Sequence, residues 1–176
     1  MKVLALAAAA ALSFTVITSP VGKQFPVLKA ETLKDQVVTL PDAVKGKSSI
    51  ICLAYSQKAE KDLKTWYEPT YNKFIAKTGL MDDVYDIHLY FIPMFTGANA
   101  AAAGSAKKQI EKDVQVDLHP HILVYRGDVD AYKASLSMDD KEKPYIYVLD
   151  AAGKVVYMTS GAFTEEKMDE IEDKLE

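Results

Sequence analysis

Ser49-Ile-Ile-Cys-Leu-Ala-Tyr55 is a continuous apolar run, which is typical of a strand covered on both faces of a sheet. Two similar runs, Asp86 to Ile92 and Tyr145 to Leu149, follow later in the chain. Between the first two runs, apolar residues from Leu63 to Ile75 fall at helical spacing, with an interruption expected at Pro69 because proline lacks a backbone donor. Buried strands separated by a helix predict an α/β fold with a parallel centre.

The remaining elements complete a single domain that extends from residue 20 to residue 176. We expect an extended entry at 20–30, strands at 36–40, 121–125 and 155–159, and helices at 98–116 and after the capping residue Thr164. The turn Asp150-Ala-Ala-Gly153-Lys154 joins two of the strands in a hairpin. The predicted architecture is a mixed central sheet with helices on both faces.

Residues 1–19 have the layout of a secretory leader. A basic start at Lys2 precedes the apolar run Val3 to Leu12, which is short for a membrane span of roughly 20 residues. The cleavage point stays open, since Ala11-Leu12-Ser13 fits the small-x-small rule and Ser19 is followed by Pro20. We therefore expect export to a periplasm or the cell exterior. Contact with a membrane is expected only if the leader is retained as an anchor.

Composition narrows the classes of function. The chain has 176 residues, of which 49% are hydrophobic and 26% charged, so collagen-like and disordered proteins are excluded. Its 21 basic and 25 acidic residues give a net charge of −4, and Arg126 is the single arginine. Nucleic-acid binding normally requires a basic surplus, so nucleic acid is not an expected partner.

The order of elements, with Lys143-Pro144 just before the hairpin and a terminal helix, resembles the thioredoxin fold. This resemblance implies a cis proline at Pro144 that faces a redox site. Val21 to Pro26 and Gly46-Lys47 are similar to the entry of peroxiredoxins. The redox residues of such proteins follow the strand that corresponds to 49–55, and here that place holds Ser56-Gln57-Lys58-Ala59-Glu60-Lys61 without a cysteine.

A closer resemblance is to the mitochondrial ATP synthase assembly factors. It is carried by Ala54-Tyr55-Ser56, Asp62 to Trp66 with Pro69, Tyr145 to Asp150, and Ser160-Gly161 before Thr164-Glu165-Glu166. Those proteins are thioredoxin-like, lack a general redox motif, and help the membrane subunit a assemble into the F0 sector. The likeness does not cover the alanine-rich segment near residue 100, and the leader differs from an arginine-rich mitochondrial transit peptide.

The single cysteine, Cys52, lies in the middle of the first buried strand. Alternation along that strand places its thiol in the core beside Ile50 and Ala54. Dithiol chemistry needs a second sulfur, and a peroxidatic thiol needs an accessible position of low pKa. We therefore predict a non-catalytic protein; the alternative is a single-cysteine thiol peroxidase or oxidoreductase that uses Cys52.

The main functional prediction is a protein or peptide binder that acts as an assembly or folding aid. The expected binding groove is the one that the thioredoxin fold offers to extended chains, formed by Tyr55, Ser56, Gln57, Lys58, Pro144 and Tyr145. Tyrosine-rich strands are a second candidate interface, with core packing as the alternative. Met94-Phe95 before Gly97 is a candidate exposed apolar tip.

Metal binding is a further alternative. His119-Pro120-His121 places two imidazoles on one side of an extended chain, and His88 is a candidate third ligand for zinc or copper. Solvated or strand-edge histidines are the competing interpretation. No cofactor is expected, since the sequence has no phosphate-binding glycine loop.

Overall fold

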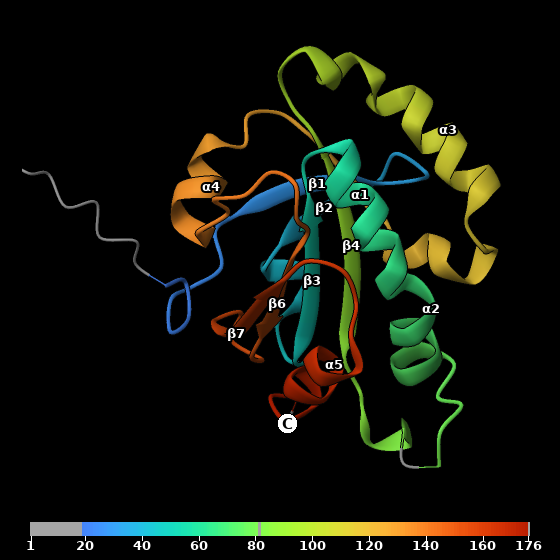
Figure 1. Cartoon of the computed structure of the whole chain (residues 1–176), viewed down its shortest axis with the longest axis vertical. Coiled ribbons are helices and arrows are strands. Elements are labelled where there is room, and N and C mark those ends of the chain that lie inside the picture. The colour runs from blue at the N-terminus through green and yellow to red at the C-terminus, as the bar shows by residue number, and fades with distance from the viewer. Residues whose placement is uncertain (1–18, 81, 176) are drawn as a thin grey trace, which may run out of the picture.

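The computed structural model describes residues 19–80 and 82–175 (Figure 1). Nearly all of the predicted leader lies outside these residues. The strands are β1 (Leu28–Thr32), β2 (Val37–Leu40), β3 (Ser49–Ala54), β4 (His88–Phe95), β5 (Leu123–Arg126), β6 (Tyr145–Leu149) and β7 (Val155–Ser160). The α-helices are α1 (Gln57–Leu63), α2 (Tyr67–Thr70), α3 (Ala103–Asp113), α4 (Asp130–Leu136) and α5 (Glu165–Glu172). Within the described ranges, none of the helices is both long enough and apolar enough to span a bilayer.

The strands form one mixed sheet in the order β2-β1-β5-β4-β3-β6-β7. The centre is parallel, with β4 between β3 and β5, whereas β6, β7, β1 and β2 pair antiparallel toward the two edges. All six residues of β3 are buried, as expected for a strand at the centre of a sheet that is covered on both faces. The predicted α/β class with a mixed central sheet is confirmed.

Helices cover both faces of this sheet, as the sequence predicts. One core packs α1, α3 and α5 on the face that includes Cys52, through residues such as Leu63, Ala103 and Ile171. The opposite core packs α4 and the N-terminal segment, through residues that include Leu136. Figure 1 shows α4 on the other side of the sheet from α1, α2 and α3.

The long helix predicted around Trp66 is interrupted near the expected proline. It consists of α1, a 3-10 turn at Lys64–Trp66, α2 with Pro69 inside it, and a π-helical turn at Tyr71–Ile75. Proline removes one backbone donor, and the residues before and after α2 form hydrogen bonds with the 3-10 and π spacing instead of the α spacing. The capped final helix is also found, since the Thr164 hydroxyl accepts a hydrogen bond from the Lys167 amide.

Three elements differ from the sequence-based prediction. Strand β4 does not end at Pro93 but continues to Phe95, because Pro93 stands opposite Ala54 where the ladder with β3 ends. The predicted extended entry leads into strand β1, whose buried and exposed residues alternate at first. Helix α4 was not expected, since it has seven residues, no side-chain cap and only Leu136 buried, and so lacks an apolar stripe.

Candidate binding site at the ends of β3 and β6

The junction of β3 and α1 is organised by Ser56. Its extended backbone (φ −147°, ψ 160°) ends the strand, and its hydroxyl accepts a hydrogen bond from the Ala59 amide at 3.1 Å as the N-cap of α1. The same hydroxyl donates to the carbonyl oxygen of Lys141 at 2.6 Å. The segment 56–61, where the resemblance places the redox residues, therefore begins with a serine that joins a helix to a distant loop.

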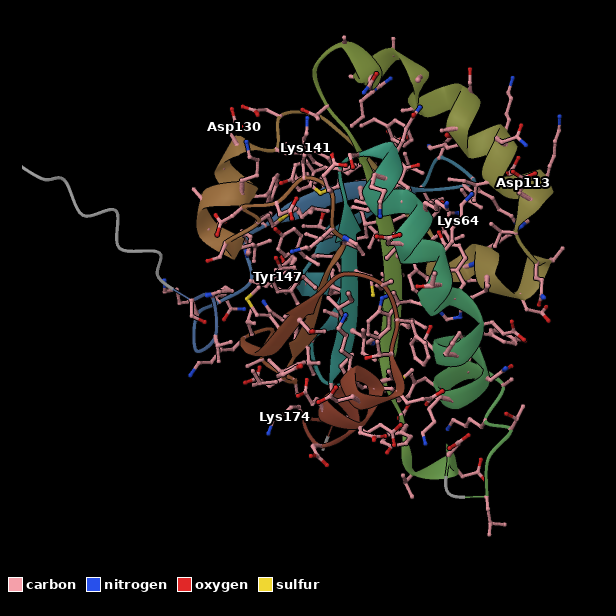
Figure 2. The ribbon with its side chains drawn as sticks, viewed as in Figure 1. Lys64, Asp113, Asp130, Lys141, Tyr147 and Lys174 are labelled. Atoms are coloured by element: carbon pink, nitrogen blue, oxygen red, sulfur yellow. The ribbon has the colours of Figure 1, made fainter. Side chains whose placement is uncertain are left out.

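That distant loop, residues 137–144 between α4 and β6, is held down by tyrosine hydroxyls. Each of these tyrosines lies just after β3 or within β6, and each binds a backbone group of residues 136–140. Figure 2 shows Lys141, within the loop, near the first turn of α1. The bonds run from Tyr55 to the Met138 carbonyl (2.8 Å), from Tyr147 to the Leu136 carbonyl (2.9 Å), and between Tyr145 and both the amide (2.6 Å) and the carbonyl (3.2 Å) of Asp140.

The surroundings of these three tyrosines keep their hydroxyls protonated. Burial raises the pKa of Tyr55 to about 12, with nearby Tyr145, Asp140 and Asp139 acting in the same direction. Burial also raises the pKa values of Tyr145 and Tyr147. The three hydroxyls therefore stay protonated through the physiological pH range and donate to backbone carbonyls rather than act as general bases, and the Tyr145 hydroxyl also accepts from the Asp140 amide.

The predicted groove residues lie together, but not all of them are accessible. Gln57 and Lys58 are exposed, Tyr55 and Ser56 are partly exposed, and Pro144 and Tyr145 are buried. In the described part of the chain the cis peptide bond is Leu40-Pro41, so Lys143-Pro144 is trans and differs from what the thioredoxin resemblance implies. The accessible surface at this place is the first turn of α1 and the outer side of the 137–144 loop.

Cys52 lies in the core, as the alternation along β3 predicts. Its exposed fraction is 0%, and its neighbours in the sheet are Phe91 of β4 and Ile146 of β6. Burial raises the pKa of the thiol, so the thiolate that peroxidatic or disulfide chemistry needs is disfavoured. The alternative function as a Cys52 enzyme requires an accessible thiol, and the structure does not provide one.

The three histidines do not combine into a metal site. His119 Nε2 lies 3.0 Å from the Val114 carbonyl oxygen, and His121 Nδ1 lies 3.1 Å from that of Leu89. His88 begins β4, where burial and then Lys47 lower its pKa. Among residues 19–80 and 82–175, no three His, Cys, Asp or Glu side chains are arranged to hold a metal ion. The geometry thus gives the metal alternative no support.

The predicted apolar tip is part of the core, whereas the tyrosines of the strands are only partly so, since Tyr90 and Tyr157 remain partly exposed. Met94 and Phe95 are 2% and 9% exposed, so the predicted apolar tip is wrong; β4 carries both residues into the sheet. Tyr145 and Tyr147 are also buried. Their i, i+2 spacing on one strand places both on the same face, and this signal could have revealed the contacts with the 137–144 loop in advance.

The Trp-Pro helix and the β7–α5 connection, both noted in the sequence, contact each other. The indole Nε1 of Trp66 donates to the Gly161 carbonyl at 3.0 Å, and its ring packs edge-to-face on Phe163 at a centroid distance of 5.3 Å. The Phe163 amide donates to the Thr65 hydroxyl at 2.9 Å. Through these contacts each of the two segments fixes the position of the other.

Comparison with protein families finds that the model of the ATP10 protein family matches residues 17–174. Among curated proteins, no sequence matches the chain.

Solved structures support the fold alone. The thioredoxin domain of a thiol-disulfide oxidoreductase from Bacteroides vulgatus has a TM-score of 0.60 at 21% identity, covering 89% of this chain and 98% of its own. The exposed lipoprotein thioredoxin Etrx1 from Streptococcus pneumoniae has a TM-score of 0.57 at 11% identity, and the match covers 85% of this chain and 100% of its own. A SCO1/SenC family lipoprotein from Bacillus anthracis has a TM-score of 0.56 at 14% identity, and the match covers 85% of this chain and 92% of its own. The thioredoxin-like fold is therefore shown.

Proposed function

The chain belongs to the ATP10 protein family, and from this membership we propose that it is a non-catalytic thioredoxin-like protein that binds a polypeptide as an assembly or folding aid. One observation carries the proposal. The segment 56–61, where the resemblance places the redox cysteines, has none; the hydroxyl of its first residue, Ser56, forms two hydrogen bonds, and the single thiol of the chain is buried in the core.

The surface proposed for the polypeptide is the first turn of α1 with the outer side of the 137–144 loop. Gln57 and Lys58 are exposed there, and Tyr55 is half-buried beneath them. The loop is tied down by side-chain hydrogen bonds, so a partner meets a preformed surface and loses less conformational entropy on binding. From the resemblance to ATP synthase assembly factors, the expected partner is a segment of a membrane protein. We also propose that the protein acts after export.

The non-catalytic part of the proposal is tested by thiol titration with a chromogenic disulfide. The native chain should show no reactive thiol, and the unfolded chain should show one. Gln57→Cys is the matched positive control, because residue 57 is exposed and its thiol should react in the native state. Rapid reaction of Cys52 in the native chain would overturn this part and favour a thiol enzyme.

The binding part is tested by site-specific photocrosslinking in cells that express the full chain. A photoreactive residue at Gln57 should yield a discrete adduct with a membrane protein, identified by mass spectrometry. The same residue at Lys174, exposed on the segment after α5, is the control and should not yield that adduct. Identical products at both positions, or none at Gln57, would refute the proposed surface.

A further inference from the structure

A second site, separate from the proposed binding surface, begins with two cations on neighbouring strands. The β1–β5 ladder pairs Glu31 with Val124 and Thr32 with Leu123. Extending the same antiparallel register by two residues would place Lys29 across from Arg126. In the part of the chain that the structure describes, neither side chain forms an ion pair. Both side chains are exposed, and like charges on adjacent strands repel each other, so an anion between them would be favourable.

A cavity of about 330 Å³ lies against these two cations. Its other walls are the first turn of α3, at Ala103 and Gly104, and the side chain of Lys107 from the same helix. Figure 1 shows α3 beside the turn that joins β1 to β2, which agrees with the ion pair between Lys107 and Asp35 in that turn. The cavity is therefore bounded by the sheet on one side and by a helix on the other.

The carboxylates of the cavity are already engaged. Lys107 is 9% exposed, and its Nζ lies 2.5 Å from Glu31 and 2.7 Å from Asp35. The cavity thus holds three cationic and two anionic side chains, and the surplus positive charge belongs to Lys29 and Arg126. Both carboxylates are paired with Lys107, so neither of them neutralises Lys29 or Arg126.

We propose that this cavity binds a compact oxyanion, the phosphate or carboxylate group of a small molecule, between Lys29 and Arg126. The planar guanidinium of Arg126, the protein's single arginine, offers two parallel N–H donors to such a group, and Lys29 offers a point charge from the other strand. An anion between them removes their mutual repulsion. The neighbouring Glu31 and Asp35 restrict the ligand to a compact anion, because an extended polyanion would meet their negative charge.

The test is isothermal titration of the full chain at low ionic strength, with inorganic phosphate in one series and acetate in the other. At least one anion should bind saturably with a stoichiometry of one, and the preferred anion identifies the class of ligand. Arg126→Gln should weaken binding at least about tenfold. Lys174→Gln, which removes an exposed lysine at the far end of the molecule (Figure 2), should leave binding unchanged.

Three outcomes would overturn the proposal: no saturable binding of either anion, equal losses in Arg126→Gln and Lys174→Gln, or unchanged binding in Arg126→Gln. Arg126 is exposed and its substitution should not impair folding, which circular dichroism verifies. Lys29→Gln provides a second variant from the opposite strand and should show the same direction of change. The result does not depend on the proposed polypeptide surface, since the two experiments use different residues and ligands.

Discussion

Removing the hydroxyl of Tyr147 should destabilise the protein through one identifiable hydrogen bond. Tyr147 is 0% exposed, and its hydroxyl donates to the Leu136 carbonyl at 2.9 Å. Tyr147→Phe keeps the aromatic ring and its edge contact with Phe25, at a centroid distance of 5.9 Å, so the packing is retained. What is lost is the donor, and the buried carbonyl is left without it.

An unsatisfied buried acceptor costs about 1–3 kcal/mol, so we expect Tyr147→Phe to lower the free energy of unfolding by about 2 kcal/mol. The matched control is Tyr55→Phe, which removes a similar bond of 2.8 Å to the Met138 carbonyl. Tyr55 is only partly buried, so water replaces its hydroxyl and the loss should stay below about 1 kcal/mol. Comparing the two variants therefore separates the effect of burial on the free energy of unfolding from the effect of losing a hydrogen bond.

Urea unfolding measures the difference directly. Trp66 is the chain's single tryptophan and is fully buried, so its fluorescence reports the global transition. A loss of about 2 kcal/mol shifts the urea midpoint by roughly 1 M at an m-value of about 2 kcal/mol/M, and lowers Tm by roughly 4–8 °C. Equal midpoints for Tyr147→Phe and Tyr55→Phe, or no shift in either, would refute the idea that the buried bond to the end of α4 stabilises the protein more than the partly exposed one.

Three further changes can be followed in the same assay. Ser56→Ala removes the cap of α1 and the tie to Lys141, so it should cost roughly 1–3 kcal/mol, whereas Ser56→Thr, which keeps a hydroxyl, should cost less. Thr164→Ala at the exposed cap of α5 should cost about 1 kcal/mol, and Thr164→Ser should restore it. Burial lowers the pKa of His121, so the folded state binds its proton less readily than the unfolded state. Stability should therefore decline as the pH falls below about 6.5, and His121→Gln should reduce that decline.

Much of the fold was predictable because its central strands carry a strong local signal. The run from Ser49 to Ala54 is apolar throughout, and it is buried throughout. Helix α4 gave no such signal, since it buries only Leu136, and its Tyr132 hydroxyl bonds the Val27 carbonyl, which lies 105 residues away in the sequence. The continuation of β4 through Pro93 was equally hidden, because proline is tolerated at a ladder's end and that end depends on the length of β3.

The candidate site was predictable in position but not in accessibility. The missing cysteine after β3 and the buried thiol of Cys52 follow from the sequence, since both depend on local order and on alternation. The burial of Pro144 depends instead on the 137–144 loop, which is fixed by bonds between residues far apart in the chain, such as Tyr55 and Met138. The spacing of apolar residues along the sequence cannot predict a hydrogen bond between two residues that lie 83 positions apart.

Ser56 links the closed loop to the proposal that this protein is non-catalytic. A hydroxyl both donates and accepts well, so one serine can cap α1 and hold the Lys141 carbonyl at 2.6 Å. A thiol is a weak donor and a weak acceptor, and a reactive thiolate donates nothing, so a cysteine there would release the loop. Redox chemistry requires that release, because the sulfur must be reached by a substrate. The serine at this position therefore holds the first turn of α1 and the 137–144 loop together, which is the arrangement that the proposed binding surface requires.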